Sequence, residues 1–127
     1  MKYKEDFQSL FYRLKAILVN FEPNLVVTAN EYGNYSLNTP FIKKYGKEVF
    51  FGAVSIKKNY VSYHLMPVYV FPELLDGLSP ALKKRMQGKS CFNFTAINSG
   101  ILDELSELTH QGFSRFQQEG RADSGGG

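Results

Sequence analysis

Several residue types that mark particular protein classes are scarce in this sequence. The 127 residues include one cysteine, Cys91, two histidines and no tryptophan. A single cysteine excludes an intramolecular disulfide framework and a zinc site built from cysteines. The longest apolar runs, 49–54 and 65–71, are far shorter than the roughly 20 residues with which a helix crosses a membrane.

Two further absences bear on location and partners. The first residues include Glu5 and Asp6, which argues against a signal or transit peptide, so we expect a cytoplasmic protein with no membrane partner. The net charge is only +3, and no motif of stacking aromatic residues accompanies the lysines. We therefore expect no nucleic-acid partner. Nothing in the sequence indicates an oligomeric state.

Apolar side chains, in contrast, are plentiful. Apolar residues make up 43% of the chain and aromatic residues 15%. A folded chain of this length buries roughly two-thirds of the surface that the unfolded chain exposes, which is enough for one core. We predict one domain over 1–119 and a disordered, glycine-rich tail over 120–127.

The spacing of apolar residues predicts an α+β fold. Spacings of three and four predict helices at 6–21 and 99–118, with Asp6 as the N-cap of the first. A third helix is predicted over 80–87, because Ser79 and Pro80 form a strong start signal. A loop is predicted between Pro67 and Pro72, followed by a helical turn over 73–77.

Alternating patterns predict the strands. Two short strands fall within 24–39, a hairpin over 48–66 and a further strand over 89–96. The chain order then implies a largely antiparallel sheet covered by the N- and C-terminal helices.

The register of the predicted hairpin depends on the length of its loop. If the Lys58-Asn59 connection makes a loop of two or four residues, pairing places apolar residues on a face that belongs to the core: Ile56 with Val61, Val54 with Tyr63, and Gly52 with Leu65. A loop of three residues would break this register. The opposite face is polar and carries Lys57 with Tyr60, Ser55 with Ser62, and Ala53 with His64.

This polar face is the candidate ligand site. If the strand over 89–96 lies beside the hairpin, the predicted ligand-binding residues are Lys57, Tyr60, Ser62, His64, Lys89 and Cys91. Ammonium, phenol and imidazole groups beside small residues suit a small anion, such as a phosphate or a carboxylate. The plain alternatives are a face buried under a helix and an ordinary solvated surface. Convergence of the Lys57 and Lys89 ammonium groups on one point would favour the anion site.

Signs of catalysis or of metal binding are weaker. The sequence has no glycine-rich phosphate loop, nucleophile elbow or His-Glu-x-x-His helix, so we expect no enzyme. The least favoured alternative is an enzyme that uses Cys91, with the ammonium of Lys89 favouring its thiolate. Asp103, Glu107 and His110 share one helix face and could hold a divalent metal, although a solvated helix face has the same pattern.

Parts of the chain resemble a known family. The segments Phe50–Lys57, Tyr60–Tyr69 and Gly88-Lys89-Ser90-Cys91-Phe92 are similar to the YdhG-like family of small bacterial domains of unknown function. The resemblance covers residues 43–121 and implies a compact α+β domain with Lys57, Lys89 and Phe92 as shared residues.

The resemblance also implies a second function. Some relatives carry the label of a frataxin-like iron chaperone, which would make iron the cofactor or cargo of the Asp103, Glu107 and His110 set. Iron-chaperone surfaces rely on many exposed carboxylates, whereas this chain is net basic. We therefore rank a small binding module, without a resident cofactor, above an iron carrier and both above an enzyme.

Overall fold

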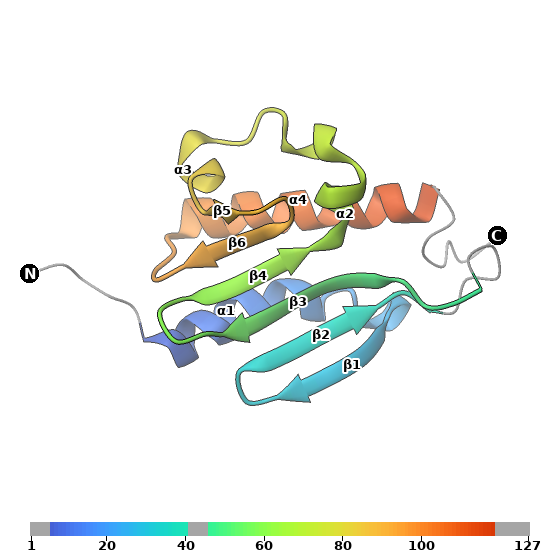
Figure 1. The fold of residues 1–127 in the computed structure, drawn as a ribbon, viewed down its shortest axis with the longest axis horizontal. Coiled ribbons are helices and arrows are strands. Elements are labelled where there is room, and N and C mark those ends of the chain that lie inside the picture. Colours follow the sequence, from blue (N-terminus) through green and yellow to red (C-terminus); the bar gives the residue numbers. More distant parts are fainter. Residues whose placement is uncertain (1–5, 41–45, 119–127) are drawn as a thin grey trace, which may run out of the picture.

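The computed structural model describes residues 6–40 and 46–118. They form one α+β domain around a six-stranded antiparallel sheet with the strand order β1-β2-β3-β4-β6-β5 (Figure 1). The predicted fold class is confirmed. No helix within the described ranges is long and apolar enough to cross a membrane.

The bounds of the elements agree with most of the predictions. The helical segments are α1 (Phe7–Val19), η1 (Glu22–Asn24), α2 (Met66–Val70), η2 (Pro72–Leu75), α3 (Pro80–Lys83) and α4 (Ser99–Gln118), of which η1 and η2 are 3-10 turns. The strands are β1 (Val26–Glu31), β2 (Asn34–Asn38), β3 (Phe50–Ile56), β4 (Val61–Leu65), β5 (Met86–Gln87) and β6 (Cys91–Phe94). The two long helices and the predicted strands are confirmed. The predicted tail over 120–127 lies outside the described residues.

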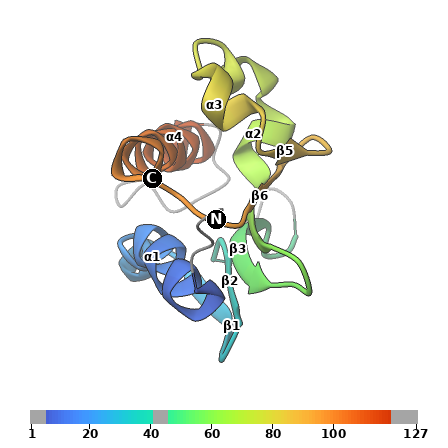
Figure 2. The ribbon, with the colours of Figure 1, turned by 90° about the vertical axis from the view of Figure 1, so that its left-hand side faces the viewer.

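The core lies between the sheet and the two long helices. Figure 2 shows α1 and α4 on the same side of the sheet. Asp6 caps α1 by accepting a hydrogen bond from the backbone N–H of Gln8 at 3.4 Å. In the buried interface, the Tyr63 hydroxyl lies 2.6 Å from Thr109 Oγ1, and Thr109 in turn donates to the Leu105 carbonyl at 2.8 Å. These two consecutive hydrogen bonds satisfy the buried hydroxyl groups of Tyr63 and Thr109 and join β4 to α4.

The predicted register of the central hairpin is confirmed. The core-side pairs are Ile56 with Val61, Val54 with Tyr63, and Gly52 with Leu65, and the polar-side pairs are Ser55 with Ser62 and Ala53 with His64. β6 extends both faces, because Phe92 lies opposite Tyr63 and Cys91 lies opposite His64.

One irregularity in β3 changes which aromatic ring enters the core. Leu37 of β2 pairs with Gly52, but the next residue, Asn38, pairs with Phe50, so Phe51 is an extra residue in β3. Strict alternation would put Phe51 on the polar face with Ala53. The bulge instead lets Phe51 be fully buried, while the Phe50 ring lies 4.8 Å from the ring of His64.

Two predicted elements are wrong in part. The helix predicted over 80–87 ends at Lys83, and Met86 and Gln87 form β5, which pairs with β6. Pairing satisfies backbone groups of β6 that a longer helix would leave unpaired, and Gly88 closes the turn with a φ of 80°. The segment predicted as a loop after Pro67 is the helix α2, which tolerates proline because Pro67 lies in its first turn.

Replacement of Gly112 by alanine should destabilise the protein. The new Cβ would lie 2.8 Å from Pro67 Cβ, which is closer than carbon atoms pack. Overpacking costs about 1–3 kcal/mol, and we expect the free energy of unfolding, measured by urea denaturation, to fall by that amount.

The matched control is Gly100→Ala near the start of α4. There the nearest atom to a new Cβ is Asn98 Oδ1 at 3.4 Å, so the free energy of unfolding should change little. Equal losses in the two variants would contradict a tight contact between α2 and α4.

Candidate functional site

The structure brings three of the predicted site residues together on the polar face. Cys91 and His64 are direct partners across β6 and β4, and cross-strand partners point to the same face. Ser62 lies two residues before His64 and opposite Asn93. All four side chains are half-buried. These four residues, Ser62, His64, Cys91 and Asn93, are here called the polar floor, and they lie in the middle of the sheet.

His64 is the most constrained member of this group. Its Nε2 shares a hydrogen bond of 2.8 Å with Ser90 Oγ, and its ring packs against Phe50. Burial lowers the pKa of His64 below its ordinary value of 6.5, because the charged imidazolium would lose hydration. His64 is therefore neutral at pH 7, and it orients Ser90 rather than supplying a positive charge.

The two lysines of the predicted site lie near opposite ends of β4. Lys57 lies at the hairpin end, where its backbone N–H donates to the Tyr60 carbonyl at 2.8 Å. Lys89 lies beyond the other end, in the turn that leads into β6. About six residues of strand separate the two positions, which corresponds to roughly 20 Å along the sheet. The six predicted residues therefore fall into two groups. Lys57 and Tyr60 form one, and Ser62, His64, Cys91 and Lys89 form the other.

Sequence reasoning missed Arg85 as a residue beside the polar floor. The Arg85 carbonyl accepts a hydrogen bond of 2.8 Å from the backbone N–H of Asn93, so its backbone lies opposite Asn93. The side-chain oxygen of Asn93 is buried and has no hydrogen-bond partner among the described residues. The only signal for Arg85 was its place next to β5, which the helix predicted over 80–87 concealed.

Sequence reasoning also missed a cavity between β5 and the segment that contains α2 and η2. This cavity, here called the α2–β5 groove, has a volume of about 400 Å³. Its lining residues come from α2, η2 and the segment before β6, and they are Val68, Tyr69, Pro72, Leu75, Met86, Gly88 and Lys89. Lys89 is the one charged residue in this lining, and Tyr69 beside it is 54% exposed. The groove was not foreseen because α2 was predicted as a loop and Met86 as helical.

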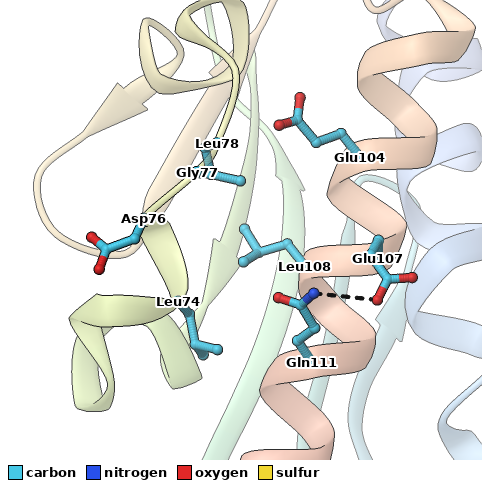
Figure 3. A pocket seen from close by; sticks show the side chains of 8 residues that line it. All are labelled: Leu74, Asp76, Gly77, Leu78, Glu104, Glu107, Leu108 and Gln111. Carbon is cyan, nitrogen blue, oxygen red and sulfur yellow. Dashed lines mark hydrogen bonds between the residues drawn. The ribbon is translucent and has the colours of Figure 1, made fainter.

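A second cavity lies between the segment 74–78 and α4 (Figure 3). Its volume is about 260 Å³, and its apolar walls are Leu74, Leu78 and Leu108. The Glu104 carboxylate beside it accepts hydrogen bonds from Ser79, at 2.7 Å from the backbone nitrogen and 2.6 Å from Oγ. Glu104 therefore fastens the start of α3 to α4. Both oxygens of the Glu104 carboxylate are already hydrogen-bonded to Ser79.

The structure does not group the predicted metal ligands with one another. Asp103, Glu107 and His110 are exposed on α4, and no three His, Cys, Asp or Glu side chains within 6–40 and 46–118 are grouped to hold a metal ion. The His110 ring instead packs against Phe21 at 5.6 Å, and Glu107 accepts a hydrogen bond from Gln111. Iron binding therefore remains a hypothesis that rests on the family resemblance.

Comparison of the chain with protein-family models, curated proteins and solved structures found no match. The functional argument therefore rests on the geometry of the two candidate regions, the polar floor and the α2–β5 groove.

The lowered pKa of His64 predicts a pH-dependent stability. In the window between the lowered pKa and the ordinary value of 6.5, the unfolded chain binds more protons at this position than the folded chain. The free energy of unfolding should therefore fall as the pH falls from 7.5 through this window, by at most about 1.4 kcal/mol per pH unit from this one group.

Urea denaturation at a series of pH values tests this expectation. His64→Gln should remove the His64 contribution to the slope. A slope that persists unchanged in His64→Gln would show that other groups cause it.

Proposed function

We propose that the protein is a small-molecule-binding module whose ligand occupies the α2–β5 groove. The observation that carries this proposal is a mostly apolar cavity of about 400 Å³ with a single charged residue, Lys89, among the described residues that line it. Ligand sites in proteins are typically concave, mostly apolar and about 300–1,000 Å³ in volume, with few polar groups. The exposed Tyr69 adds an aromatic surface at the same place.

A binding role suits this groove better than catalysis. No histidine, cysteine or carboxylate lines it, whereas catalysis by side chains needs a nucleophile, a base and an orienting group in one place. The alternative enzyme would use Cys91, whose cross-strand neighbour His64 has its Nε2 hydrogen-bonded to Ser90.

We extend the proposal to two expectations from the sequence: that the protein is YdhG-like and that it is cytoplasmic. The turn with Gly88 and Lys89 belongs to the segment that resembles the YdhG-like family, and Lys89 is one of the residues implied as shared. The free thiol of Cys91 suits the reducing cytoplasm.

Substitution of Tyr69 tests the groove as the ligand site. In this test, a library of small apolar and amphipathic fragments is to be screened by ligand-observed NMR, and Kd is to be measured for the fragments that bind. Tyr69→Ser should weaken binding about tenfold, because the ligand loses its contact with an aromatic ring.

Tyr32→Ser is the matched control, since Tyr32 is another exposed tyrosine, 71% exposed, at the tip of the β1–β2 hairpin. Its Kd values should equal those of the parent. Fragments whose affinity is unaffected by Tyr69→Ser would place the ligand elsewhere.

The second candidate function is the binding of a small anion on the polar floor. The position of Arg85 favours this function. Arg85 lies opposite Asn93, and Asn93 pairs with Ser62, so a residue with a guanidinium group lies beside the polar floor. In this form of the hypothesis, Arg85 takes the role that the sequence assigned to Lys89. Lys57, at the hairpin end of the same face, supplies the second charge.

Inorganic phosphate is the probe for this candidate. Its titration at constant ionic strength should shift the backbone amide signals of Ser62 and Asn93, and the apparent Kd should rise severalfold in Lys57→Met and in Arg85→Met. Lys89→Met should leave it unchanged, because Lys89 lies about 20 Å along the sheet from Lys57. Amide signals that do not respond in the parent protein would rule the candidate out.

A further inference from the structure

We propose that the ligand of the α2–β5 groove is a carboxylate with an apolar body, held at its charged end by Lys89. This inference rests on the proposed function, and it adds the chemical class of the ligand. The residues that line the groove divide into an apolar part and a single cationic end, and each part specifies one half of the ligand.

The charge around the groove selects an anion. Lys89 is the one charged residue in the lining, and it follows Lys83, Lys84 and Arg85 in a segment where no acidic residue occurs between Gly77 and Leu102. The nearby carboxylate of Glu73, on η2, is paired with Arg115 at 2.7 Å. Asp76, the residue after Leu75, lines the cavity beside α4 instead. A cationic ligand would therefore meet like charge at Lys89, whereas an anion meets an ammonium group.

The number of donors selects a single negative charge. The residue after Lys89, Ser90, is buried, and its hydroxyl is engaged with His64 Nε2 at 2.8 Å. Gly88, before Lys89, has no side chain and only permits the turn. One ammonium group matches a carboxylate, whereas a phosphate dianion would keep one charge without a partner.

The rest of the groove selects an apolar body. Leu75 and Met86, which are half-buried, provide aliphatic and thioether surface, and the buried side chain of Val68 lies beneath them. Met86 adapts its flexible side chain to ligands of differing shape. Burial of each additional methylene of the ligand should improve affinity about threefold to fourfold until the cavity is full.

Three probes of the same length separate the charge from the apolar contact. We measure Kd for octanoate, octanol and octylamine by NMR titration, below the concentrations at which they form micelles. The parent protein should bind octanoate about five- to tenfold more tightly than octanol, and octanol more tightly than octylamine.

Substitution of Lys89 tests the assignment of the charged end. Lys89→Met should reduce the affinity for octanoate to that for octanol, and Lys89→Arg should keep the preference for the carboxylate. Lys58→Met is the matched control: it removes one exposed lysine in the β3–β4 connection, and with it one positive charge of the whole molecule, far from the groove. It should retain the preference.

The outcomes distinguish this inference from the function on which it rests. Equal binding of the three probes, or an octanoate preference that survives Lys89→Met, would overturn the carboxylate while leaving a ligand in the groove. No binding of any probe, together with no fragment that depends on Tyr69, would overturn both.

Discussion

Close packing against α4 positions the whole segment that connects β4 to β5. Pro67 of α2 meets Gly112 so closely that a Cβ would not fit between them, and Ser79 is fastened to Glu104 by two hydrogen bonds. α2 and α3 are only five and four residues long, and helices of that length have no stability of their own. The α2 and η2 walls of the α2–β5 groove therefore owe their positions to α4, which packs on the core-side face of the sheet (Figure 1), whereas the β5 wall is held by pairing with β6.

The short hairpin of β5 and β6 separates the two candidate regions. Met86 and Lys89 line the groove, whereas Cys91 and Asn93 contribute to the polar floor. Met86 lies opposite the core-side residue Phe92, and Lys89 lies in the turn at Gly88, before the alternation of β6 begins at Cys91. The hydrogen bond between Ser90 and His64 links the two regions, because it joins the residue after Lys89 to the centre of the floor.

Patterns that are local in the sequence predicted the fold well. The Asp6 cap, the Ser79 start of α3 and the pairing of Val54 with Tyr63 depend on neighbouring residues or on one short turn. The errors arose where distant partners decide the conformation. Residues 85–87 leave the helix because β6 offers them a pairing edge.

The candidate site was predicted only in part for a related reason. Alternation along a strand shows which side chains share a face, so His64 and Cys91 could be expected together. It does not show the register in which β6 pairs with β4, and that register places Lys89 beyond the end of β4, so Lys57 and Lys89 were assigned to one site. The α2–β5 groove depends on the packing of α2 and α4, which no short-range pattern in the sequence records.

The most direct test of the central claim is the position of a bound ligand. Intermolecular NOEs between octanoate and the protein, with ¹³C-labelled methyl groups, report which side chains the ligand touches. Our account predicts NOEs from the alkyl chain to the methyl groups of Val68, Leu75 and Met86, which line the α2–β5 groove. NOEs confined to Leu74 and Leu108, which line the other cavity, would contradict it.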